Sequence, residues 1–205
     1  MRTATGSWIR SAAAIGGAAA VFWLLSAVPV SADSWDFIVG QSCDPFDPNG
    51  HMSLWFYSPM GQEFVPEFDR LEVVELHTHD MGTGSDTLGA VLRVDVHRST
   101  IYDPVLGSSD LVDLAHGFQG VTHFEFTVPV SLEPGSLYVI ELVQVAGENW
   151  GCGTHGYAWE ICPGGRPIIG GEPLEYSDLW FREGVLGYSA AVPSSWGVIK
   201  TLYRQ

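Results

Sequence analysis

The sequence predicts an all-β protein in which two antiparallel sheets form a sandwich, and three observations support this fold class. Apolar and polar residues alternate with a period of two, which is typical of half-buried strands. Clusters of Gly, Pro, Asp and Ser separate the alternating segments, at spacings that suit a sandwich. No helical crossovers are legible, and a parallel α/β fold would need them.

Three strands are expected before residue 80, at 53–58, 61–66 and 70–79. Each is rich in aromatic or β-branched residues, which pack well on a pleated surface. Pro59, Gly61 and Pro66 lie at or near their ends and favour turns there. Two loops, 47–50 and 81–89, are expected to be exposed because Gly, Asp and Asn dominate them.

The later strands are expected at 89–99, 121–128, 136–145 and 178–183. The first two alternate most clearly, and their expected inward faces are Ala90, Leu92, Val94 and Val96, then Thr122, Phe124, Phe126 and Val128. Segment 136–145 is apolar on both faces and follows a Pro-Gly turn, which predicts a central strand covered on each side. Segment 178–183 closes the series, with Trp180 expected in the core.

The chain is expected to contain three parts, with residues 1–32 forming a signal peptide. A start with Arg2 and Arg10, an apolar run over 12–28 and small residues before Asp33 favour export and cleavage, with an uncleaved membrane anchor as the alternative. Residues 33–186 suit a single sandwich domain. Residues 187–205 read as a linker and a short basic helix. We therefore expect a monomer secreted to the periplasm, the medium or the surface of a bacterium.

Charge excludes some classes of partner. Without Arg2 and Arg10, seven basic residues remain against 24 acidic ones, a formal charge of −17. Nucleic acids and anionic lipids bind through basic side chains that neutralise phosphates, so neither is an expected partner. The same acids also keep an exported protein soluble, which is the simpler explanation for their number.

Three cysteines remain in the exported part of the chain, where oxidising conditions allow disulfides. Cys152 and Cys162 flank a Gly-rich stretch that could form a hairpin, so they are the favoured pair and Cys43 is then free. A bond from Cys43 to either of the others is the alternative that the sequence leaves open.

Three segments resemble bacterial secreted β-sandwich domains of the carbohydrate-binding jelly-roll kind. They are GQEFVPEFDRLEVVEL, VTHFEFTVPVSLEPGSLYVIEL, and PGGRPIIGG with the later DLWFRE, and together they span most of 61–183. These are packing and turn residues, so the resemblance implies a fold more than a chemistry. It also implies an exported protein that is sorted to the cell surface, although the apolar anchor of the family's sorting tail is absent here.

Two metal sites are candidates. Glu75, His77 and His79 share one face of the expected strand at 70–79, and two imidazoles with a carboxylate can bind zinc. Asp80 and Asp86 offer oxygen ligands for calcium, the one cofactor that the sequence suggests. The alternatives are histidines on a solvent-facing strand and aspartates that form turns.

Aromatic residues indicate a binding site for sugars. Trp150, Tyr157 and Trp159 surround the Cys152 to Cys162 stretch, and Arg166 follows it. Sugar rings stack on exposed aromatic rings that have polar groups beside them. Packing in the core is the alternative role for the same side chains.

The expected function is therefore extracellular binding of carbohydrate or matrix material, such as polysaccharide at a cell surface. A structural surface domain without a small ligand is the second interpretation. A metal-dependent hydrolase built on Glu75, His77 and His79 is the third, and an enzyme is the less favoured class because no nucleophile motif is present.

Overall fold

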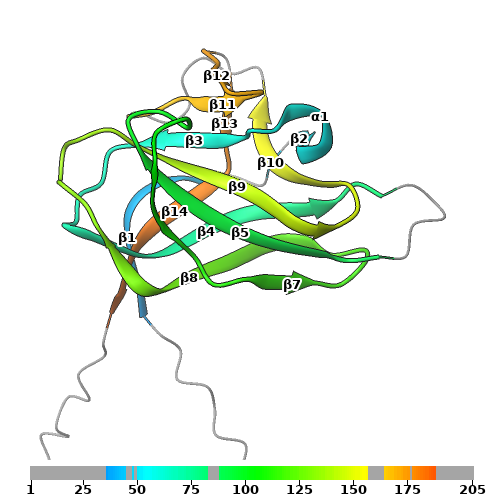
Figure 1. Ribbon diagram of the computed structural model, residues 1–205, viewed down its shortest axis with the longest axis horizontal. Coiled ribbons are helices and arrows are strands. Elements are labelled where there is room, and N and C mark those ends of the chain that lie inside the picture. The colour runs from blue at the N-terminus through cyan, green and yellow to red at the C-terminus, as the bar shows by residue number, and fades with distance from the viewer. Residues whose placement is uncertain are drawn as a thin grey trace, which may run out of the picture. The chain divides into compact units, whose positions relative to one another are not determined.

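A computed structural model describes residues 36–44, 48, 50–82, 88–156, 164–175 and 177–187 of the 205. Two antiparallel sheets pack face to face there (Figure 1), so the predicted sandwich is confirmed. Within the same ranges no helix is long and apolar enough to cross a membrane. The expected signal peptide and C-terminal helix lie outside the described residues, and so do Asp86, Tyr157, Trp159 and Cys162.

The first sheet is organised around β4 (Arg70–Asp80), which pairs with β8 (Gln119–Ser131) along one edge. Its other edge pairs first with β14 and then with β10. The remaining described strands join these two, β1 to β14 and both β2 and β13 to β10. Their bounds are β1 (Asp36–Cys43), β2 (Gly50–Ser53), β10 (Trp150–Gly156), β13 (Ser177–Leu179) and β14 (Phe181–Gly187).

The second sheet is organised around β9 (Tyr138–Gly147), which lies between β3 and β5. Tyr138 and Val139 are both buried although they point to opposite faces, so the prediction of a strand covered on each side is confirmed for this end of β9. The other strands run outward from this centre as the order β12-β11-β3-β9-β5-β6, with β7 also on β5. Their bounds are β3 (Gly61–Phe64), β5 (Ala90–Arg98), β6 (Val105–Ser108), β7 (Val112–Leu114), β11 (Pro167–Ile169) and β12 (Glu172–Pro173).

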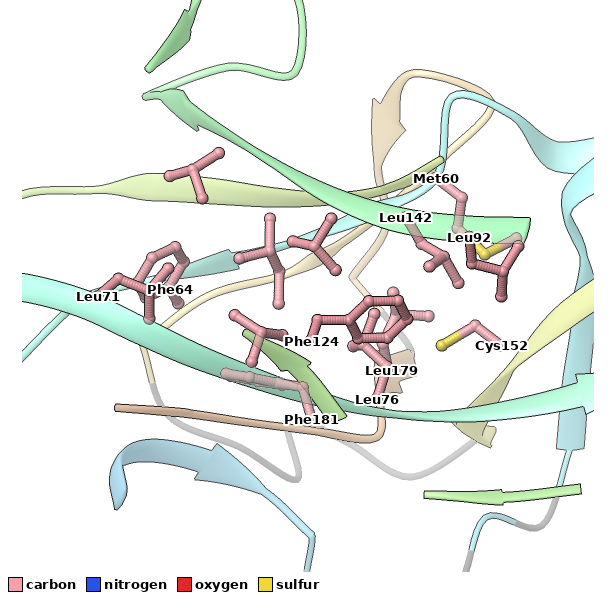
Figure 2. Packing of buried hydrophobic residues seen from close by; sticks show 14 of the residues in the cluster. Met60, Phe64, Leu71, Leu76, Leu92, Phe124, Leu142, Cys152, Leu179 and Phe181 are labelled. Carbon is pink, nitrogen blue, oxygen red and sulfur yellow. The ribbon is translucent and has the colours of Figure 1, made fainter. Parts of the chain in front are cut away.

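The hydrophobic core fills the space between the sheets. Leu76, Phe124 and Phe181 enter it from the first sheet, while Phe64 and Leu92 enter it from the second (Figure 2). Each such side chain contributes about 1.5–3 kcal/mol through burial. The inward face that the alternation predicts for β5 is confirmed, since all four of its predicted side chains are buried.

The prediction for β8 is correct only in its first half. Thr122, Phe124 and Phe126 are buried, but the side chain of Val128 is 78% exposed. The reason is a register shift, because Leu71 pairs with Val130 whereas Val73 pairs with Glu125. Residues 126–129 of β8 therefore lie opposite Glu72 alone and form a bulge, so alternation no longer decides which side chains after Phe126 face the core.

The strand predicted at 53–58 is wrong. Strand β2 ends at Ser53, and a four-residue helix, α1 (Leu54–Tyr57), follows it. Leu54 is buried and the next three side chains are exposed, a pattern without the period of a strand. A short run of apolar residues cannot be assigned from periodicity alone, which is why the sequence misled here.

The glycines of the segment after residue 163 serve as turns, as predicted. Gly170 and Gly171 join β11 to β12 with φ angles of 62° and 83°. Both values lie in the left-handed region, which glycine adopts without steric cost. The resulting short hairpin lies at the edge of the second sheet (Figure 1).

The predicted bond between Cys152 and Cys162 is wrong, because Cys152 is a free thiol. Its side chain is fully buried in the core, on the face of β10 that points toward the second sheet (Figure 2). Burial raises the pKa of this thiol to about 12, so it stays protonated and unreactive. Cys43, by contrast, is in the disulfide-bonded state.

We expect a disulfide between Cys43 and Cys162, because these are the cysteines that remain once Cys152 is a thiol. Peptide mapping without reduction should recover the two halves as one linked fragment. A thiol reagent should label one site per chain, Cys152, and only after denaturation. A linked fragment that contains Cys152 would contradict this pairing.

Glu183 on β14 is a buried carboxyl beneath the bulge of β1. Its Oε1 accepts a hydrogen bond from the backbone N–H of Gln41 at 2.7 Å, while Oε2 has no partner among the described residues. Burial raises the pKa of Glu183 to about 7, against the effect of the Gln41 bond, and nearby Glu67 raises it further. Ionised Glu183 is therefore costly to the fold.

Substituting Glu183→Gln should stabilise the protein at neutral and alkaline pH. Below the ordinary pKa of 4.5 the carboxyl is protonated in both states, so it has no pH-dependent cost. As pH rises from there to about 7, the unfolded chain loses the proton first, and the fold loses about 3 kcal/mol of stability. Urea denaturation should therefore show a larger benefit of the variant at about pH 8 than at about pH 4. An equal effect at both pH values would contradict this account.

Candidate functional site

Three histidines meet on the outer face of the first sheet, which is the face predicted for His77 and His79. His51 reaches them from β2 on the far side of β10, and its ring stacks on that of His79 with centroids 4.3 Å apart. The centroids of His51 and His77 are 5.6 Å apart. We call His51, His77 and His79 the histidine layer.

Glycine in β10 makes room for this layer. Gly153 pairs with His51, and Gly151 pairs with His79. A Cβ atom on Gly153 would lie 2.6 Å from Cγ of Pro48 and 3.1 Å from Cβ of His77, which is too close. The rings of two strands that are not neighbours can therefore meet over the bare backbone of β10.

Glu75 does not join the two histidines with which it was predicted to bind a metal. Its carboxylate lies 3.3 Å from Nδ1 of His123 on β8 and 3.4 Å from Nη1 of Arg182 on β14. Arg182 also binds Asp44 and lies over the ring of Trp180, which is buried as predicted. Among the residues that the structure describes, no group of His, Cys, Asp and Glu is arranged to hold a metal ion.

Asp80 was predicted to bind calcium, but both of its oxygens accept hydrogen bonds from N–H groups. Oδ1 accepts from the backbone of Gly82 at 2.7 Å, and Oδ2 accepts from the backbone of Gly117 at 2.6 Å. His116 lies 2.9 Å from the same Oδ2. Although burial opposes it, these bonds lower the pKa of Asp80. The carboxylate therefore fastens the end of β4 to the turn before β8.

Of the aromatic residues predicted to form a sugar site around residue 150, only Trp150 lies in the described part of the chain. Trp150 is fully buried and stacks on Phe118, so its ring cannot contact an external ligand. Arg166, the polar group predicted beside it, is held by Glu63 through its backbone N–H and two guanidinium bonds. The positive charge of Arg166 is therefore already matched.

Among the residues that the structure describes, exposed aromatic rings gather on α1. The side chains of Trp55 and Phe56 are 72% and 75% exposed, and Tyr57 is 44% exposed. Only Leu54 anchors the helix in the core. Tyr102 adds a fourth exposed ring beside them. Its hydroxyl group packs against Gly171. The backbone N–H groups of Gly170 and Gly171 in turn donate hydrogen bonds to the carbonyl oxygens of Tyr57 and Pro59, which holds this turn next to α1. We call these four rings the aromatic surface.

An open pocket of about 590 Å³ adjoins the aromatic surface. Trp55, Ser58 and Pro59 form one wall, and residues 141–148 at the end of β9 form the other. It exists because β3 begins at Gly61, opposite Glu141. Beyond Leu142, no strand in the described part of the chain pairs with this edge of β9. Backbone N–H and C=O groups at the edge are thus available to a ligand.

Glu141 is the one pocket residue that belongs to a buried polar network. Its Oε2 lies 2.9 Å from Nε2 of His97, and Nδ1 of His97 lies 2.7 Å from the carbonyl oxygen of Asp103. A carbonyl only accepts, so Nδ1 carries a proton, which leaves Nε2 facing the carboxyl group of Glu141. Burial raises the pKa of Glu141, although His97 opposes this.

The alternation of apolar and polar residues in β5 placed His97 on the outer, polar face of that strand. The alternation could not show that His97 would have a partner, Glu141, on the neighbouring strand β9. Arg93 and Asp95 share that face and pair through two bonds of 2.9 and 3.0 Å. The partner Glu141 belongs to a strand read as apolar on both faces. The link between the two strands comes from their register, in which Asp95 pairs with Glu141.

No protein-family model matches the chain, and no curated protein matches it. The resemblance to secreted carbohydrate-binding domains therefore rests on sequence segments alone. The structure shows its coarser part, a sandwich of two antiparallel sheets.

The histidine layer predicts sensitivity to acid. Burial lowers the pKa of His51, and charges on His79 and His77 lower it further. Above the ordinary pKa of 6.5 the ring is neutral in both states. As pH falls below that value, the unfolded chain takes up the proton first and stability falls. His51→Phe, which keeps a ring for stacking, should therefore lose less melting temperature than the wild type between about pH 7.5 and pH 5.

His123 supplies the matched control, because its hydrogen bond with Glu75 raises its pKa despite partial burial. Its contribution to stability is complete below 6.5 and is lost as pH rises through the raised pKa. The variant His123→Phe should lose more melting temperature on acidification than the wild type. Parallel pH profiles for both variants would rule out this opposition.

Proposed function

We propose that this domain is an exported binding module whose ligand is a carbohydrate or a carbohydrate-rich matrix. The observation that carries the proposal is the aromatic surface, where Trp55 and Phe56 are exposed beside an open pocket. A contiguous patch of exposed apolar rings on a protein surface commonly marks a site of contact with a partner. The C–H faces of sugars stack on such rings, and their hydroxyl groups need polar partners nearby.

The pocket offers these polar partners in a fixed arrangement. Glu141 is held by His97, Glu148 and Gln144 lie further along the same wall, and the edge of β9 adds backbone groups. The wall belongs to a central strand of the second sheet, whereas the rings are on a short helix. A rigid polar wall with rings opposite suits a pyranose better than it suits an extended apolar ligand.

Export supports the same assignment. The first 32 residues have the pattern of a signal peptide, and the chain is strongly acidic. A protein on the outside of a bacterium meets polysaccharides of walls and matrices. The second interpretation is a structural surface domain without a small ligand. It also accounts for export, but it gives the pocket no role.

Replacing Trp55 should abolish most of the binding without harm to the fold. We expect Trp55→Ala to weaken depletion by insoluble cellulose, chitin or peptidoglycan at least about tenfold, near 1.4 kcal/mol. The melting temperature should change little, because the side chain is 72% exposed.

Val128→Ala is the matched control, since this exposed apolar side chain lies on the bulge of β8 in the other sheet. It should bind as the wild type does. Equal binding by the Trp55 variant would remove the aromatic surface from consideration. Failure of the wild type to bind any polysaccharide, with no ligand raising its melting temperature, would favour the structural interpretation.

A further inference from the structure

The charged residues that line the pocket between α1 and β9 are all acidic. Glu141 and Glu148 line it, and none of the described lining residues is Lys, Arg or His. Behind the wall, Arg93 is paired with Asp95, and the carboxyl of Glu141 has a partner in Nε2 of His97, 2.9 Å away. The carboxylate of Glu148 therefore remains as the uncompensated charge.

Glu148 has no counter-charge of its own. It is exposed, and it forms no ion pair with any residue that the structure describes. Gln144 donates to its backbone carbonyl, which ties residue 148 back to β9. A negative group is thus placed at the mouth of the pocket.

Trp55 lines the same pocket from α1, across from the residues of β9. The face of an indole ring attracts cations, and the combination of an aromatic face with a carboxylate is suited to an ammonium group. An acidic sugar would meet repulsion from Glu148 and from a chain of formal charge −15. A neutral sugar would leave the charge of Glu148 unused.

We propose that this pocket selects a saccharide that carries a protonated amine, with Glu148 as the counter-charge and Trp55 as the stacking ring. Glu141 is a positioning group that His97 holds against the wall, where its free oxygen accepts from the sugar. The inference rests on the carbohydrate-binding function proposed above and narrows it to a class of ligand, an oligomer of glucosamine.

Two hexasaccharides that differ only in acetylation test the inference directly. Glucosamine hexamer carries free amines, and N-acetylglucosamine hexamer has the same rings with the amines capped. Isothermal titration calorimetry at about pH 6 should give a dissociation constant at least about tenfold lower for the free amine. Raising ionic strength from about 0.05 M to about 0.3 M should weaken that ligand and leave the capped one unchanged.

Variants separate the site from the general acidity of the protein. Glu148→Gln should remove the preference for the free amine while the weaker binding of the capped hexamer remains. Glu133→Gln is the control of equal charge, because Glu133 is exposed and pairs with Arg98 away from the pocket. It should keep the preference.

The outcomes are distinct. Equal binding of both hexamers, lost in Trp55→Ala, would overturn the inference and leave the carbohydrate function in place. Binding of the free amine that neither Trp55→Ala nor Glu148→Gln weakens would also overturn it, as nonspecific attraction to an acidic protein. If neither hexamer binds, the inference is wrong, and the polysaccharide depletion assay decides the broader function separately.

Discussion

Successive residues of an extended chain point to opposite sides of a sheet, and on β4 this constraint determines what both faces of the first sheet contain. Val74, Leu76 and Thr78 turn inward, while Glu75 and its neighbours of the same parity turn outward. A slip of one residue would place carboxylate and imidazole in the core. Pairing with three strands fixes the register against such a slip. The core and the polar outer face therefore depend on each other.

Both sheets place a histidine and a glutamate together on their outer faces. His123 binds Glu75 on the first sheet, and His97 binds Glu141 on the second. In each pair the partners come from neighbouring strands. Glu75 and His123 are in direct register, whereas Glu141 lies two residues from Val139, the register partner of His97. Cross-strand pairs of this kind stabilise a sheet where its face is only partly wetted. The pair on the second sheet adjoins the pocket between α1 and β9, because Glu141 lines that pocket.

Much of the fold could be predicted from the sequence, because alternation reports burial directly. The strands around Leu92 and Phe124 were predicted for this reason, and the strand around Tyr138 was predicted because it is apolar on both faces. Prediction failed where a local rule did not apply. The run from Leu54 to Tyr57 has no alternation, and the bulge of β8 exposes Val128 although its parity points inward.

The site was predicted less well, since it depends on contacts between distant segments. Residue types and spacing within one strand predicted that Glu75 would share a site with His77 and His79. In the structure His51 from another strand contacts these two histidines, and Glu75 pairs with His123 instead. Trp150 is a residue type that often stacks on sugars, but it is fully buried in the core. Neither outcome can be read from residues that are near each other in the chain.

The short helix α1 joins the core through a single side chain, Leu54. The side chains of Trp55 and Phe56 contribute little to the free energy of folding because water already surrounds most of their area. Substitutions at these two positions are therefore nearly neutral for stability. Exchange of one ring for another there would change the surface that α1 presents to solvent, while the sandwich beneath would continue to fold as before.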